Sequence, residues 1–212
     1  MKKKSWETTR KIFINWLSKN QLKNMIAQEC ARIMIEHDIK KYYTAKVKAA
    51  SNLNLTHLGC LPSNSEIEEK LIDYYKLFHG ESHEILIRKL RKTAFNIMNI
   101  LAFFEPLLVG PVASGTASST SHVNIHLTAE NMEDVIILLE SKNITFKLID
   151  KKLKMNNFDT KVFNGLCFIY EDTNIDLTIF SHAEKKHAPI SRINNKPMVR
   201  VKLSALKKQI QL

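Results

Sequence analysis

The chain of 212 residues is poor in the residues that mark several large classes of protein. Five glycines and five prolines exclude a collagen-like or low-complexity composition. The three cysteines are odd in number, widely spaced and outside any CxxC pattern, which argues against a disulfide framework and a structural zinc site. We therefore expect Cys30, Cys60 and Cys167 to be small buried hydrophobic residues of a cytoplasmic protein.

Long apolar runs are also missing from the sequence. The longest candidate, residues 97–109, is interrupted by Asn99, Glu105 and Pro106, and it falls short of the roughly 18 to 20 apolar residues that a membrane span needs. The first residues are basic, but no apolar stretch follows them. We therefore expect neither a membrane span nor a secretory signal.

Positive charge is abundant, and it gathers at the two ends of the chain. The net charge is +11. Residues 1–50 hold 12 Lys and Arg against 4 Asp and Glu, and residues 181–212 hold 8 against 1, whereas the middle is mildly acidic. Two basic ends indicate contacts with a polyanion such as a nucleotide or RNA, although lysines that only keep a protein soluble would produce the same counts.

Hydrophobic periodicity predicts an α+β protein with a helical first part. Helices are expected over residues 19–38, 42–50, 64–78 and 82–103, with a stop at His79-Gly80 and a capped start near Ser63. Strand patterns follow at 107–109, 122–127, 144–149, 153–155, 162–170, 175–180 and 199–203, with helices at 130–140 and 204–210. We expect a basic helical region over residues 1–84 and a mixed sheet flanked by helices over residues 85–212.

The segment between the first two expected strands carries the most information about function. It begins at Gly110-Pro111, continues through Ser114-Gly115-Thr116 and ends at Ser121, just before an alternating strand. A turn of small residues with two glycines lets backbone N–H groups approach an anion closely. A plain glycine turn between two strands is the alternative interpretation.

This segment resembles the signature of the DNA polymerase β-type nucleotidyltransferase superfamily. That signature has a strand, Gly-Ser, Gly-Thr a few residues on, and Ser-Asp-x-Asp on a second strand. Gly110, Gly115-Thr116 and Ser121 fall at its spacing, and Asp176 in the strand 175–179 matches its third carboxylate. The resemblance covers about residues 85–181 and implies a palm-type α+β domain that holds a nucleotide triphosphate. The amino-acid sequence around Gly110-Pro111 also resembles that of a group of proteobacterial proteins.

The sequence departs from that signature at the residues that bind metal. His122 and Asn124 stand where the two metal-binding Asp residues belong, and Pro111 replaces the phosphate-binding Ser. Mg²⁺ or Mn²⁺ prefers carboxylate oxygen, and a two-metal mechanism needs several such ligands. Asp176 alone would hold at most one weakly bound ion, so we expect no standard two-metal nucleotidyl transfer.

His122 and Asp176 form the remaining candidate pair. An imidazole and a carboxylate on adjacent strands are able to share a hydrogen bond or a metal ion, and Asn124 lies on the same face. His126 stands about 13 Å along the strand from His122, too far to share one zinc ion with it. Lys185, Lys186, Arg192 and Arg200 are candidates for contacts with phosphate.

Other chemistry has little support in the sequence. No GxxxxGK[ST], GxGxxG, HExxH or GxSxG motif is present. Trp6, Phe13 and Trp16 lie at near-helical spacing among basic residues, as in a helix that docks on the protein, on nucleic acid or on a membrane surface.

Three hypotheses remain open from the sequence. The first is a pseudoenzyme that binds a nucleotide or RNA through Gly110, Ser114, Gly115, Thr116, Ser121, Asn124, Lys185 and Lys186. The second is an atypical transferase in which Asp176 and His122 act, with Mg²⁺ or Mn²⁺ if it is active. The third is a protein-interaction domain that has no ligand chemistry.

Overall fold

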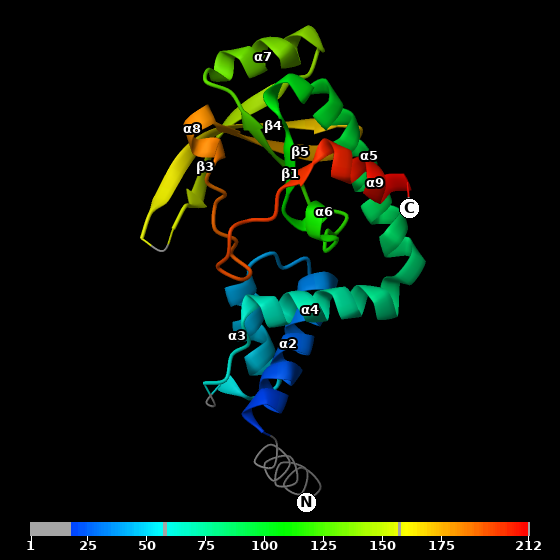
Figure 1. The fold of residues 1–212 in the computed structure, drawn as a ribbon. Helices are drawn as coiled ribbons and strands as arrows, with labels where there is room; N and C mark the ends of the chain where they lie inside the picture. Colours follow the sequence, from blue (N-terminus) through cyan, green and yellow to red (C-terminus); the bar gives the residue numbers. More distant parts are fainter. Residues whose placement is uncertain (1–17, 57–58, 157, 212) are drawn as a thin grey trace, which may run out of the picture. The chain divides into compact units, whose positions relative to one another are not determined.

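The computed structural model describes residues 18–56, 59–156 and 158–211. They divide into two compact units, one within residues 1–78 and one within residues 79–212, and each unit has a hydrophobic core of its own (Figure 1). The expected aromatic helix around Trp6, Phe13 and Trp16 lies outside the described residues. Within the described ranges, no helix combines the length and the apolar character that a membrane crossing requires.

The first unit is helical, as its periodicity predicts. Its helices are α2 (Lys19–Glu36), α3 (Tyr42–Asn52) and α4 (Asn64–Tyr74). Ser18 and Ser63 cap α2 and α4, and each forms a capping box with the Gln or Glu three residues later. The side chains between these helices are mostly small or aliphatic, among them Ile26, Cys30, Ala45, Ala49 and Ile67.

The helical segment that begins with α4 ends at His79, as expected, but the next helix starts at Gly80 rather than near Ser82. A five-residue π-helix (Tyr75–His79) follows α4, and α5 (Gly80–Ile100) begins directly after it. Gly80 adopts a positive φ of 32°, so glycine accommodates the irregular backbone at this junction. A π-turn holds one more residue than an α-turn and shifts the side chains after it, so Tyr75 is buried while Phe78 is exposed.

The second unit is built on a six-stranded mixed sheet with the order β3-β4-β5-β2-β1-β6. Its strands are β1 (Leu107–Val109), β2 (Val123–Thr128), β3 (Phe146–Lys154), β4 (Thr160–Tyr170), β5 (Thr173–Phe180) and β6 (Val201–Lys202). β2 and β5 are parallel neighbours, whereas the other adjacent strands are antiparallel. The pairing of β2 with β5 brings two segments that lie about 50 residues apart in the sequence side by side.

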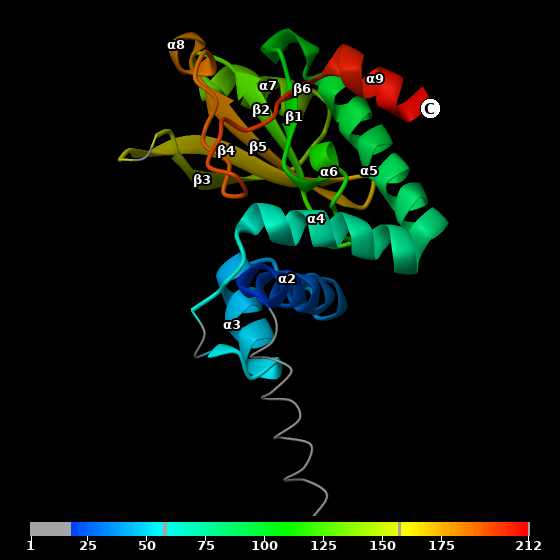
Figure 2. The ribbon, with the colours of Figure 1, turned by 60° about the horizontal axis from the view of Figure 1, so that its bottom comes forward.

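Three helices cover one face of this sheet: α5, α7 (Met132–Ser141) and α9 (Leu203–Gln211) (Figures 1 and 2). Every second residue of the central strands points toward them, so Ile125, Leu127 and Leu177 are fully buried. The alternate residues of the same strands form the opposite face, which carries the polar side chains.

Several local expectations need correction. Residues 144–149 and 153–155 were expected as two strands, but β3 runs through both because it pairs continuously with β4. The turn after Gly110 contains a short helix, α6 (Pro111–Ser114), and a second one, α8 (His182–Lys185), follows β5. Cys30 and Cys60 are buried as expected, but Cys167 is only half-buried.

Candidate functional site

The polar side chains of the second unit lie on the sheet face that the helices leave uncovered. The sheet register places Asn124 of β2 directly beside Asp176 of β5. Along the same two strands, His126 stands beside Thr178. All four side chains alternate with the core residues, so period-two patterning alone puts them on one face.

Asp176 is the centre of this polar face. Its side chain is largely buried, and each of its oxygens has a cationic or ionisable partner. The Nδ1 of His122 lies 3.2 Å from one carboxylate oxygen, and the ammonium group of Lys151 forms an ion pair with the other. The pairing of His122 with Asp176 that the sequence suggested is therefore present, with Lys151 as a third member.

Lys151 reaches Asp176 by crossing a strand that carries no side chain at that point. Lys151 lies on β3, and β4 stands between β3 and β5. At Gly165 of β4, an added Cβ would lie 3.2 Å from the Cγ of Lys151 and 2.6 Å from the carbonyl oxygen of Leu177. Glycine at this position therefore leaves the room through which the lysine stem passes.

Sequence reasoning missed both Lys151 and Gly165. Lysine is common on exposed strands, and nothing in its local pattern pointed to a carboxylate 25 residues away. A lone glycine inside a strand pattern is, however, a known sign of close backbone approach. Gly165 was therefore the one local signal that another part of the chain approaches β4 closely at this point.

The turn after β1 adjoins this cluster through Asn124. Gly110 has a positive φ of 74°, and a Cβ there would lie 3.3 Å from the Nδ2 of Asn124. That amide donates a hydrogen bond to the carbonyl oxygen of His122 at 3.1 Å. The structure thus brings Gly110, His122, Asn124 and Asp176 together at one end of β2.

Most polar groups of the turn already bond to one another. The amides of Gly115 and Thr116 both donate to the carbonyl oxygen of Pro111. The hydroxyls of Ser114 and Thr116 are 3.0 Å apart, and the Ser121 hydroxyl accepts from the amide of Ser118 at 2.9 Å. A ligand at this turn would therefore compete with internal hydrogen bonds rather than meet a ready-made ring of donors.

Two side chains from α5 hold the turn in place. The guanidinium group of Arg91 donates to the carbonyl oxygens of Val112 and Ala113, both at 3.3 Å. The Nε2 of His83 lies 3.1 Å from the carbonyl oxygen of Ala117. Burial lowers the pKa of Arg91 and is the main cause that lowers the pKa of His83.

The candidate lysines at the other end of β5 are not part of this cluster. Lys185 lies on α8, after β5 has run four residues beyond Asp176, and it forms an ion pair with Glu105. Lys186 follows it and is exposed. Arg200, in contrast, folds back over the ring of Phe180 at the end of β5.

The donor set around Asp176 does not fit a Mg²⁺ or Mn²⁺ pair. It offers one carboxylate, one imidazole and one amide, and the carboxylate is already neutralised by the ammonium group of Lys151. Hard divalent cations prefer several oxygen ligands. Within the described residues, no three His, Cys, Asp or Glu side chains come together as a metal site would require.

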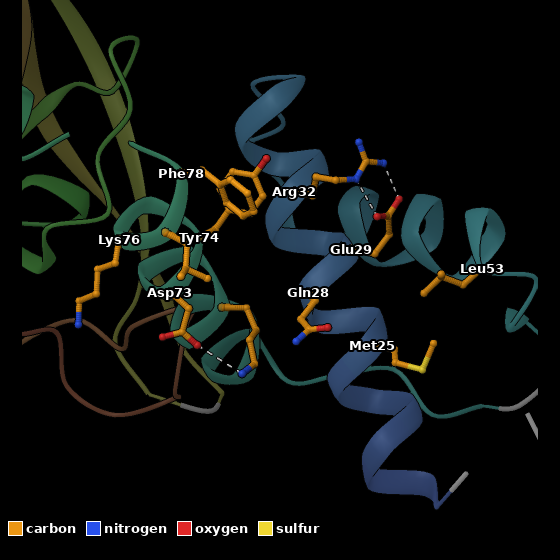
Figure 3. Close-up of a pocket in the computed structure, with 11 residues that line it drawn as sticks. Met25, Gln28, Glu29, Arg32, Leu53, Asp73, Tyr74, Lys76 and Phe78 are labelled. Carbon is orange, nitrogen blue, oxygen red and sulfur yellow. Dashed lines mark hydrogen bonds and ion pairs between the residues drawn. The ribbon is translucent and has the colours of Figure 1, made fainter. Parts of the chain in front are cut away.

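The first unit has a groove of its own, of about 650 Å³, between α2 and the segment formed by α4 and the π-helix (Figure 3). Two ion pairs, Glu29–Arg32 and Lys70–Asp73, lie among its lining residues. Leu77 and Phe78 contribute apolar surface that is 77% and 68% exposed. Apart from Lys76, the charged side chains that line the groove form ion pairs within the unit, so its accessible part is mainly apolar.

Comparison of the chain with protein-family models, with curated proteins and with solved structures gives no match.

Proposed function

We propose that the second unit binds a nucleotide or RNA at the Asp176 cluster, without standard two-metal nucleotidyl transfer. The proposal starts from the resemblance of residues 85–181 to nucleotidyltransferases. The parallel pairing of β2 with β5 supports it, because it sets Asn124 beside Asp176, as the resemblance implies for two of the metal-binding positions.

The ion pair between Lys151 and Asp176 carries this proposal. An ammonium group occupies the position beside the carboxylate that a divalent cation would otherwise neutralise. A lysine is a compact point charge and binds phosphate well without metal. Lys151 is thus able to hold a phosphate group near the turn at Gly110, although it cannot supply the Lewis acidity of a metal ion.

A thermal-shift titration tests the proposal directly. Nucleoside triphosphates and short single-stranded RNA are added to the full chain in EDTA, and then in Mg²⁺ or Mn²⁺. A ligand at about 100 times its dissociation constant adds roughly 2.7 kcal/mol to the free energy of unfolding, and binding through lysine weakens steeply with salt. We expect a salt-sensitive shift in EDTA. No shift with any nucleotide or RNA would reject the proposal.

A matched pair of variants locates the effect. Lys151→Met removes the proposed phosphate contact, whereas Lys152→Met removes the same charge from the adjacent, exposed position of β3. Ligand binding should weaken in the first variant and stay close to that of the unmodified chain in the second. Equal loss in both would mean that general positive charge, not this cluster, attracts the ligand.

One observation favours the atypical transferase as a second candidate function. The Nδ1 of His122 lies 3.2 Å from Asp176, and the His122 side chain remains 44% exposed. A carboxylate that orients an imidazole leaves the other ring nitrogen free to take a proton from a bound hydroxyl. Transfer of label from a nucleoside triphosphate, lost in both His122→Gln and Asp176→Asn, is the result expected for this candidate. Unchanged transfer in Asp176→Asn would eliminate it.

A further inference from the structure

Arg200 is a half-buried cation with no carboxylate partner. Its Nη1 donates to the carbonyl oxygen of Lys185 at 2.7 Å, and its Nη2 donates to that of His187 at 3.3 Å. Its guanidinium carbon lies 5.1 Å from the centre of the Phe180 ring. In the described part of the chain no Asp or Glu forms an ion pair with it, whereas Arg32 of the first unit pairs with two glutamates.

A buried histidine, His126, lies against the same aromatic ring, that of Phe180. His126 is only 4% exposed, and its ring centre lies 4.7 Å from that of Phe180. Burial, together with the nearby charges of Arg200 and Lys151, lowers the pKa of His126 to about 3, so the ring is neutral. A neutral imidazole with its proton on Nδ1 is a hydrogen-bond donor at that atom.

One nitrogen of each of these two side chains lacks a hydrogen-bond partner among the described residues. Among the described residues, the Nδ1 of His126 and the Nε of Arg200 are the buried side-chain polar atoms that have no hydrogen-bond partner. Buried polar atoms nearly always have one, because an unpaired group in the interior loses the hydrogen bonds it makes with water. Two such atoms beside one ring therefore leave hydrogen bonds that a further group at this ring could complete.

The surrounding charge favours an anion as that group. Arg200 and Lys151 both act electrostatically on His126, and because Lys151 is paired with Asp176, the charge of Arg200 is the one that no ion pair among the described residues offsets. The Nε–H of arginine is only a donor, and planar arginine groups suit phosphate oxygens. An oxyanion would accept from the Nε–H of Arg200 and from His126 in the tautomer with its proton on Nδ1, and it would offset the positive charge of Arg200.

The segment that carries Arg200, residues 186–200, is largely exposed. Residues 186–200 connect α8 to β6, and Ile190 donates to the carbonyl oxygen of Lys154 at the end of β3. Val199 is 75% exposed, and Pro197 is exposed as well. A segment with little buried apolar surface opens at low free-energy cost, so it gives a ligand access to the nitrogens of Arg200 and His126.

We propose that Arg200 and His126 form a binding site for a phosphate oxyanion beside Phe180. This site lies beyond the Asp176 cluster and does not rest on the proposed nucleotide function. The phosphate is either inorganic phosphate or the phosphate of a nucleotide, and the experiment distinguishes these sources.

Calorimetric titration of the full chain with inorganic phosphate, AMP and adenosine tests this site. We expect phosphate to bind and adenosine not to bind. Tighter binding of AMP than of phosphate would identify a nucleotide as the source, and equal binding would identify the free ion. Arg200→Gln should weaken phosphate binding by at least about tenfold, since a hydrogen bond to a charged group is lost. Lys196→Gln removes the same charge from the same segment and should leave binding unchanged.

Two further variants keep the test decisive. His126→Phe preserves the ring against Phe180 but removes Nδ1, and it should also weaken phosphate binding. If Arg200→Gln does not fold, Arg200→Lys keeps the charge without the Nε donor and takes its place. Absence of phosphate binding up to about 10 mM would overturn the proposal, as would equal weakening in Arg200→Gln and Lys196→Gln. Because nucleotide binding at Lys151 is a separate titration, failure of one proposal leaves the other standing.

Discussion

The two faces of the sheet in the second unit are made by the same strands and have opposite chemistry. Toward the helices, β2 and β5 present Ile125, Leu127 and Leu177, which are completely enclosed. Away from them, the same strands present Asn124 and Asp176. Alternation along a strand thus separates the residues that stabilise the fold from those that are available for binding. The predictions below test that separation.

The largest effect is expected on the helix-covered face. Leu177→Ala should lower the free energy of unfolding by about 3 kcal/mol, because it removes buried apolar volume and leaves a cavity. Thr178→Ala, one residue along and facing the other way, should cost about 1 kcal/mol. Urea denaturation of both variants measures the difference. Similar losses of unfolding free energy would contradict the idea that only the helix-covered face stabilises the fold.

The next effect concerns the crossing point of Lys151. Gly165→Ala should destabilise the unit by about 2 kcal/mol, because the new Cβ would meet the carbonyl oxygen of Leu177 at 2.6 Å. Thermal unfolding beside the exposed neighbour Asn164→Ala provides the comparison. A neutral result for Gly165→Ala would mean that β4 and β5 move apart easily and that the glycine has no steric role.

Acid should lower the free energy of unfolding of the second unit through His126, which lies on the polar face. Burial lowers the pKa of His126 from 6.5 to about 3, so the unfolded chain binds a proton at this residue that the folded chain does not. This stability is complete above pH 6.5 and is lost as the pH falls, by about 1.4 kcal/mol per pH unit. Urea denaturation between pH 5 and pH 7 should show a shallower slope for His126→Phe. An identical slope in the variant would show that His126 is not the group that titrates.

The smallest effect is expected for the ion pair of Lys151. Lys151→Met should lower the free energy of unfolding by about 1 kcal/mol, because His122 still contacts the buried carboxylate of Asp176 that loses its lysine partner. Its effect on ligand binding should be much larger. A loss of several kcal/mol on unfolding would instead assign Lys151 a structural role, and Lys152→Met is the matched control.

Local patterns were sufficient for most of the elements. The capping boxes at Ser18 and Ser63 mark helix starts because the hydroxyl satisfies a free backbone amide there, whatever surrounds it. Alternation was likewise enough to predict β2 and β5 and to place Asn124 and His126 on one face. The stop at His79-Gly80 was predicted as well, but the π-helix before it was not, because a π-turn is decided by packing on both sides of it, which short-range patterns do not contain.

The candidate site was predictable only in part. The pair of His122 with Asp176 was a prediction from the resemblance, which places position 122 and Asp176 on adjacent strands, and the structure contains the pair. Lys151 was not predictable, because nothing in residues 146–154 tells that β3 lies two strands from β5. The unpartnered nitrogens of His126 and Arg200 were equally hidden, since their burial depends on segments more than 50 residues apart in the sequence.

Residue order alone was enough to establish the α+β class, the basic ends and the presence of His122 and Asn124, rather than carboxylates, before and within β2. Composition and short-range periodicity do not depend on contacts between distant residues, so the sequence reveals them directly. The folded sheet, in contrast, is what brings Lys151 to Asp176 and places His126 and Arg200 against the ring of Phe180. Those contacts depend on strand order, which results from how the whole sheet buries its apolar face against the helices.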